Sequence, residues 1–221
     1  MDKYIDNIRN TINCFPNNYV FISKDFVDNI DYETVRKTLR RLSEKEDIKK
    51  IARGYYYKPL YLPIINDYSK PDIDSYAKAI ARNMNWKIFP TGNTALNEFG
   101  LSTQVPSNYS YISSGRTISY DEGNNKINFI HRSPRETDYS YITGSLIQAI
   151  KAVRQENITE QIIDKLSITI SKEDKKLILS ESKNTSAWIY EAIKKICKIW
   201  FMGTSQVLMK WLNISRNSKN W

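Results

Sequence analysis

Cysteine and histidine are scarce in this chain of 221 residues, which has two cysteines and one histidine. Cys14 and Cys197 are far apart in the sequence, and neither belongs to a CxxC pair or lies near a histidine pair. Disulfide scaffolds and structural zinc sites need several such residues at close spacing. The sequence therefore predicts no disulfide framework, no metal site and no cofactor, and this cysteine usage fits a reducing cytoplasm.

Long apolar segments are also missing. No uncharged apolar run approaches the roughly 20 residues that cross a bilayer. The first ten residues, MDKYIDNIRN, lack the apolar core of a signal peptide. We therefore expect a cytoplasmic protein without a membrane partner.

Catalytic signatures are the third absence. The sequence contains no HExxH, no P-loop, no Gly-x-Ser-x-Gly and no close carboxylate pair of recognisable spacing. The single histidine, His131, has no Asp, Ser or Cys arrangement around it, and a lone histidine is more often structural or exposed than catalytic. The sequence thus predicts no catalytic residues and no enzymatic activity.

Basic residues, in contrast, are in excess. The formal net charge is +9 at pH 7, and the hydrophobic fraction of 41% allows two domains with packed cores. The segment from Thr34 to Lys58 contains nine Lys or Arg and three acids. A local excess of this kind is typical of a phosphate-binding surface.

The segment after Asp31 has the pattern of an amphipathic helix. Asp31 is a suitable N-cap, and Val35, Leu39 and Leu42 recur at i, i+4 and i+7. Two strand-like runs follow, joined by Ala52-Arg53-Gly54, where Gly54 can adopt the positive φ of a tight hairpin. Helix and hairpin offer seven candidate DNA-binding residues: Arg36, Lys37, Arg40, Arg41, Lys49, Lys50 and Arg53.

The elements before this segment complete a recognisable order. Residues 3–13 predict a helix, residues 19–22 an extended run, and Ser23 begins a brief second helix. Helix, short strand, two helices and a hairpin is the order of a winged helix-turn-helix. A charged helix face is most often only solvated surface, but this order favours a helix that reads DNA beside a wing.

The predicted fold class is α+β. We expect a winged helix-turn-helix domain at residues 1–59, a proline-rich linker at 60–71, a mixed domain at 72–200 and a basic amphipathic tail at 201–221. The mixed domain should contain several helices, one of them capped by Thr91, and a small antiparallel sheet. Alternating residues predict that this sheet is a three-strand meander at residues 109–113, 116–120 and 126–130.

Three stretches carry a family resemblance. They are IARGYYYKP at residues 51–59, FPTGNTALNEFGL at residues 89–101, and YISSGRTI at residues 111–118 together with IHRSPR at residues 130–135. In this order and spacing, the chain resembles the AbiEi-like antitoxins of abortive-infection type IV toxin-antitoxin systems. The resemblance covers roughly residues 1–200.

The resemblance implies an antitoxin with two activities. The winged helix would bind inverted repeats in double-stranded promoter DNA and repress the operon, with Arg36, Lys37, Arg40 and Arg41 on the recognition helix. The C-terminal domain would neutralise a nucleotidyltransferase toxin, which in such systems needs no stable complex. Arg116, Arg132 and Arg135 lie next to the matching motifs and are candidates for that domain, although a structural role fits them at least as well.

Other functions remain compatible with the sequence. The chain could be a winged-helix transcriptional regulator without an antitoxin role, a nucleic-acid-targeted enzyme subunit, or a module that holds a toxin by direct contact. The sequence assigns no oligomeric state.

Overall fold

The structure is a computed structural model that describes residues 2–27 and 30–197. Its internal contacts divide the chain into two compact units, residues 1–86 and residues 87–221. Helices and small sheets occur in both units, which confirms the predicted α+β class. The predicted tail at residues 201–221 lies outside the described residues.

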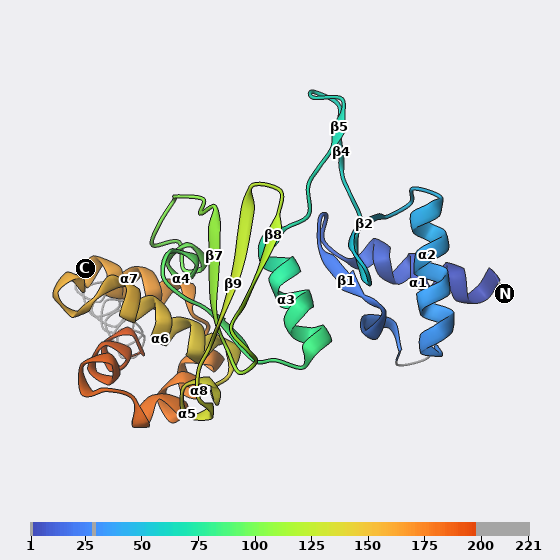
Figure 1. The fold of residues 1–221 in the computed structure, drawn as a ribbon. Helices are drawn as coiled ribbons and strands as arrows, with labels where there is room; N and C mark the ends of the chain where they lie inside the picture. Colours follow the sequence, from blue (N-terminus) through green and yellow to red (C-terminus); the bar gives the residue numbers. More distant parts are fainter. Residues whose placement is uncertain (1, 28–29, 198–221) are drawn as a thin grey trace, which may run out of the picture. The chain divides into compact units, whose positions relative to one another are not determined.

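The N-terminal unit begins with helix, strand, helix and hairpin (Figure 1). Its elements are α1 (Asp2–Cys14), β1 (Val20–Ile22), the 3-10 helix η1 (Ser23–Phe26), α2 (Tyr32–Glu44), β2 (Lys49–Ala52), β3 (Tyr55–Tyr57), β4 (Tyr61–Leu62), β5 (Asp67–Tyr68) and α3 (Ile73–Met84).

Helix α2 forms as the sequence predicts. The Asp31 carboxylate accepts a hydrogen bond from the backbone N–H of Thr34 at 3.1 Å, which satisfies one of the free donors at the start of the helix. Val35, Leu39 and Leu42 are buried on its inner face. They pack in one hydrophobic core with residues from α1, β1 and β3, so the basic face of α2 is left to solvent.

The predicted hairpin is β2 and β3. These strands and β1 form an antiparallel sheet in the order β1-β3-β2. Gly54 in the turn has φ +88°, a conformation that residues with a side chain rarely adopt. The register is irregular between Lys50 and Ala52, which is the feature of a β-bulge.

Helix α3 belongs to the N-terminal unit, although the sequence placed it in the domain at 72–200. Its Ser75 hydroxyl accepts a hydrogen bond from Val20 N at 2.8 Å, in a buried position. Arg82 donates to both oxygens of Asp25 at 3.0 and 2.9 Å, and to the carbonyl of Val20 at 3.1 Å. The helix is therefore anchored on β1 and η1. The predicted linker at 60–71 contains the hairpin β4–β5 instead of a free connection.

The C-terminal unit combines one sheet with a cluster of helices. Its elements are β6 (Ile88–Pro90), α4 (Asn93–Glu98), β7 (Asn108–Ser113), β8 (Ile118–Glu122), β9 (Asn125–His131), α5 (Pro134–Thr137), α6 (Tyr141–Val153), the 3-10 helix η2 (Gln155–Asn157), α7 (Glu160–Thr169), α8 (Lys172–Glu181), the 3-10 helix η3 (Ser182–Asn184) and a helical segment at residues 187–197. The core lies among α4, α6, α7, α8 and the segment 187–197.

The three predicted strands form, but the meander is wrong. The strand order is β6-β7-β9-β8, and β7 pairs with β9 in parallel. The chain between β7 and β8 passes over the end of β9, where the Nδ1 of His131 pairs with the carbonyl of Gly115 at 2.7 Å and His131 N donates to Thr117 Oγ1 at 3.0 Å. The histidine thus has a structural contact and holds this crossing loop.

The predicted cap at Thr91 is also wrong. Gly92 occupies the N-cap of α4, with φ +57° and no capping side chain. The Thr91 hydroxyl instead donates to Gln148 Oε1 of α6 at 3.1 Å. At the start of α8, the Ser171 hydroxyl accepts a hydrogen bond from Asp174 N at 3.1 Å and caps the helix.

Candidate nucleic-acid interface

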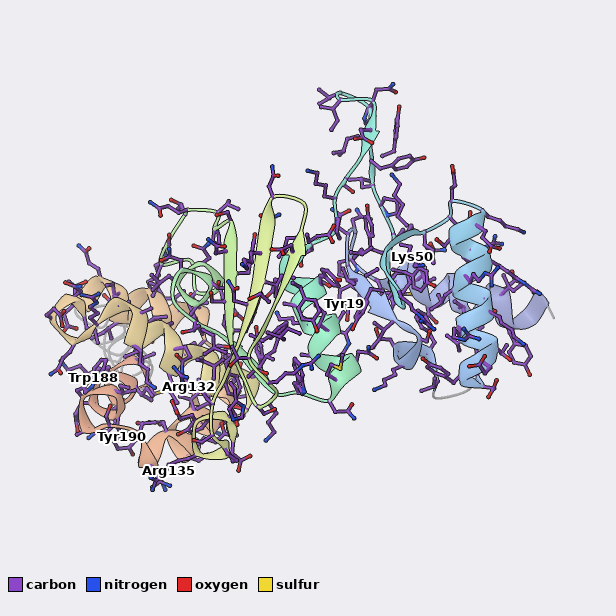
Figure 2. The ribbon with its side chains drawn as sticks, in the orientation of Figure 1. Tyr19, Lys50, Arg132, Arg135, Trp188 and Tyr190 are labelled. Carbon is purple, nitrogen blue, oxygen red and sulfur yellow. The ribbon has the colours of Figure 1, made fainter. Side chains whose placement is uncertain are left out.

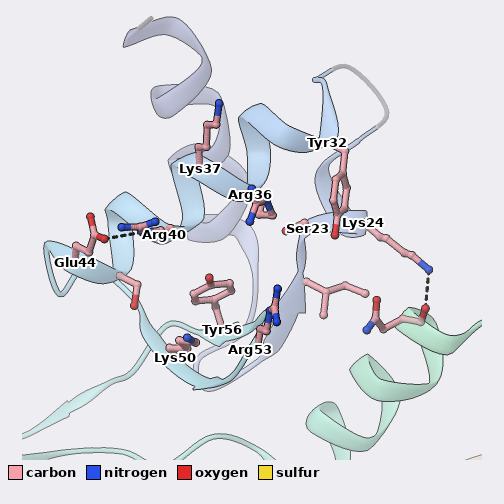
Figure 3. A pocket seen from close by; sticks show the side chains of 14 residues that line it. Ser23, Lys24, Tyr32, Arg36, Lys37, Arg40, Glu44, Lys50, Arg53 and Tyr56 are labelled. Carbon is pink, nitrogen blue, oxygen red and sulfur yellow. Dashed lines mark hydrogen bonds and ion pairs between the residues drawn. The ribbon is translucent and has the colours of Figure 1, made fainter.

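A groove of about 730 Å³ separates α2 from the hairpin β2–β3 (Figure 3). Arg36, Lys37 and Arg40 project from α2, which is free to present them because its apolar face is buried in the core. Lys50 and Arg53 come from the hairpin, and Lys24 comes from η1. Six cationic side chains from three elements therefore line one groove.

The groove carries a strong positive charge. Its lining includes these six Lys or Arg residues and a single acid, Glu44. Lys37, Lys50 and Arg53 form no ion pair with the described part of the chain, and all three are exposed. Their charge is available to a polyanion.

Two of the groove arginines are held by acids on their own helix. Arg36 pairs with Glu33 at 2.7 Å, and Arg40 pairs with Glu44 at 2.8 Å. The hydrogen bond and charge of Glu33 raise the pKa of Arg36. Exposed pairs of this spacing contribute little to stability, and a phosphate or a guanine edge can replace the carboxylate.

Tyr56 forms the base of the groove between its two walls. Figure 3 shows its ring among Arg36, Arg40, Lys50 and Arg53. Burial raises the pKa of Tyr56, and the charges of Arg36 and Arg40 oppose this rise. The phenol is therefore neutral at pH 7 and can donate a hydrogen bond to an anionic oxygen.

Two of the seven predicted DNA-binding residues lie outside the groove. Arg41 lines a separate hollow against α1, with Arg9 and Lys45. Lys49 points to the other side of its strand from Lys50, and its ammonium group lies 4.1 Å from the ring centre of Tyr68. The structure brings the other five together: Arg36, Lys37, Arg40, Lys50 and Arg53.

The groove is also lined by polar residues that the sequence did not single out as candidates for it, among them Lys24, Tyr32, Tyr56 and Asn83. Lys24 donates to the backbone carbonyl of Asn83 at 2.6 Å, which places its side chain beside α3. Tyr32 is the first residue of α2, and no local sequence pattern marks it as a groove residue. Only the packing of α3 on β1 could have indicated Asn83.

The candidate residues of the C-terminal unit are separated. Arg116 is in the loop held by His131, and Arg132 lies 4.0 Å from Glu136 and donates to the carbonyl of His131 at 3.1 Å. Arg135 lines a different hollow, of about 300 Å³, together with Lys151 of α6. Figure 2 shows the Arg135 side chain extending outward from its helix. These arginines do not converge on a shared pocket.

Residues 2–27 and 30–197 contain no group of three or more His, Cys, Asp or Glu that could hold a metal ion. None of their helices is both long and apolar enough to traverse a bilayer.

A profile described as a family of unknown function, DUF6088, matches residues 7–178, more than three quarters of the chain. The chain belongs to the DUF6088 family. The matched range includes every residue of the groove and the whole C-terminal sheet. No curated protein matches the chain.

Among solved structures, the chain is similar to the crystal structure of the RV2827C protein from Mycobacterium tuberculosis. The comparison covers 89% of this chain and 76% of that chain, at 10% sequence identity and a TM-score of 0.35. At this distance the likeness supports no conclusion about fold or function.

Proposed function

We propose that residues 1–59 form a winged helix-turn-helix that binds double-stranded DNA, with α2 as the recognition helix and β2–β3 as the wing. The observation that supports this proposal is the basic groove, in which six cations from α2, the hairpin and η1 face one another. Nucleic-acid affinity arises mainly from such phosphate neutralisation. The order from α1 to β3, helix, strand, short helix, helix and hairpin, also supports the proposal, because a winged helix has this order.

The groove residues divide into two roles in this proposal. Arg36, Lys37 and Arg40 lie on the solvent face of a helix that can enter the major groove, where arginine pairs with guanine edges. Lys50 and Arg53 lie on the hairpin and contact flanking phosphates or the minor groove. Glu33 and Glu44 pair with Arg36 and Arg40 on this face before DNA arrives.

Salt dependence tests the proposal directly. The purified chain should shift a fragment of its own promoter, and the logarithm of the binding constant should fall linearly with the logarithm of salt concentration. The slope is about −5 if all six groove cations neutralise phosphates, and it is less negative by about 1 for each cation that contacts a base edge instead. Fluorescence anisotropy between 50 and 300 mM salt measures this slope. Absence of binding at the lowest salt, or a slope near zero, would reject DNA binding through the groove.

We also propose that the chain is the antitoxin of a toxin-antitoxin pair, which represses its own operon and neutralises a nucleotidyltransferase. The resemblance at residues 51–59, at residues 89–101, and at residues 111–118 with 130–135 supports this part. The first stretch contains the hairpin turn, and the other two lie in the C-terminal unit.

Co-expression separates these two activities. If a nucleotidyltransferase is encoded beside this chain, its expression should arrest growth and co-expression of the full chain should restore it. A variant with Arg36→Ala and Arg53→Ala should still restore growth but lose repression of a promoter reporter, because the substitutions lie in the DNA groove. A full chain that fails to restore growth would exclude the antitoxin role and leave a DNA-binding regulator.

A further inference from the structure

An apolar hairpin projects from the N-terminal unit between β3 and α3. Figure 1 shows β4 and β5 extending away from the remainder of this unit. Ile64 and Ile65 at its tip are 99% and 63% exposed. Leu60, Tyr61 and Tyr68 along its length are 44%, 46% and 43% exposed. Large apolar side chains are rarely grouped in this way on a surface that contacts only water.

The hairpin has a defined conformation. Ser69 N donates to the carbonyl of Leu60 at 2.7 Å, and the rings of Tyr61 and Tyr68 meet edge to face at 5.3 Å. Lys49 of β2 stacks on Tyr68 and connects the hairpin to the main sheet. These contacts orient the apolar side chains before any partner binds, which reduces the entropy lost on binding.

We infer that this hairpin is a dimerisation surface that packs against the same hairpin of a second copy of the chain. The charge distribution favours a second copy. The chain has a net charge of +9, so most of its surface repels another copy. Residues 60–69, in contrast, carry one charge, that of Asp67, and no Lys or Arg. Lys49 of β2 lies on Tyr68 near the base of the hairpin, so two copies meet the least repulsion at its tip, at Ile64 and Ile65.

The apolar area is sufficient for a weak dimer. The exposed surface of two isoleucines, a leucine and two tyrosines amounts to roughly 600 Å² per copy, so a symmetric pair that buried all of it would bury roughly 1,200 Å². This is the lower end of the range for stable specific interfaces. We therefore expect a dissociation constant in the micromolar range, which makes the dimer sensitive to protein concentration.

Side chains, not strand addition, form this interface. The backbone N–H of Tyr68 donates to its neighbour Asp67 at 2.7 Å, so the outer edge of β5 has already used that donor. Pro63 follows β4 and removes a donor from that side. Each copy would insert its isoleucine tip beside the Tyr61–Tyr68 pair of the other copy.

DNA is a less suitable occupant of the hairpin. Apolar wedges that enter the minor groove are accompanied by Arg or Lys that contact the backbone, and residues 60–69 have neither. The inference does not depend on DNA binding by α2, because it concerns contacts between two protein chains.

The test measures the mass of the full chain by light scattering at protein concentrations from 1 to 200 µM in 150 mM salt. The mass should rise from 25.9 kDa toward twice that value with concentration. A variant with Ile64→Lys and Ile65→Lys should remain a monomer throughout, which is a rise of at least 100-fold in the dissociation constant.

A control with Val105→Lys and Ile168→Lys adds the same two charges at residues that are 84% and 86% exposed in the other unit. The control should dimerise almost normally.

Two results would contradict the hairpin dimer. One is a wild-type chain that stays monomeric at every concentration, and the other is a control variant that loses dimerisation as fully as the hairpin variant. If the wild-type chain is monomeric and the hairpin variant binds DNA more weakly, the hairpin contacts DNA. If the wild-type chain is monomeric and DNA binding is unchanged, the hairpin contacts neither. The DNA proposal is judged separately by its salt slope, so the two can fail independently.

Discussion

Replacement of Arg36, Arg40 and Arg53 by alanine should weaken DNA binding by about 100- to 1,000-fold or more at 100 mM salt. Each lost contact to phosphate or to a base edge costs about 1–3 kcal/mol. The three residues are exposed and line one groove from both walls, so their removal should not affect the core. The salt slope should also become less negative, by about 1 for each of the three side chains that contacts a phosphate. Fluorescence anisotropy gives both quantities, and circular dichroism verifies the fold.

A matched control distinguishes the groove from the general positive field. Alanine at Arg41, Lys45 and Lys49 removes the same number of charges from the same unit but leaves the groove intact. At 100 mM salt, charges more than about 10 Å from the phosphates are largely screened, so this variant should lose less than about fivefold in affinity. Equal losses in the two triple variants would show that binding uses the overall charge and not the groove.

The candidate site could be predicted in large part from the sequence because its signals are local. The N-cap Asp31, the apolar spacing of α2 and the glycine in the hairpin turn each require only neighbouring residues. The spacing of residues does not predict the direction of a side chain that lies at the edge of a helix or strand face. Arg41 is adjacent to Arg40 but lies in a different hollow, and Lys49 is adjacent to Lys50 but stacks on Tyr68.

The errors in the fold concern contacts between distant residues. Alternation predicted the strands β7, β8 and β9, but their pairing depends on where the loop at residues 114–117 crosses the sheet. The place of α3 depends on the partners of Ser75 and Arg82, which are more than 50 positions away. A stretch with several prolines suggested a linker at residues 60–71, whereas a short hairpin tolerates proline at its tip.

Gly144 should be among the positions in the C-terminal unit that are most sensitive to substitution. It is a buried residue in the interior of α6. In an exposed helix interior, replacement of glycine by alanine stabilises a protein by about 0.5–1 kcal/mol. A Cβ at this position would meet ring atoms of Phe89 at 2.4, 2.5 and 2.6 Å. Phe89 is 2% exposed and belongs to β6, so its ring has little room to move. We expect Gly144→Ala to lower the free energy of unfolding by about 1–3 kcal/mol or more. Hydrogen exchange of α6 peptides in increasing urea measures this loss.

Two further variants determine whether the close packing of Phe89 is the cause. Ser145, the next residue of α6, is fully buried, and its hydroxyl has no hydrogen-bond partner among the described residues. Ser145→Ala should therefore stabilise the unit by about 0.5–1 kcal/mol, because it removes an unsatisfied polar group and improves helix propensity. In a Phe89→Ala background, the cost of Gly144→Ala should disappear, since the added methyl group then enters the space of the ring. If Gly144→Ala costs the same with and without the Phe89 ring, the helix does not depend on glycine for its contact with β6.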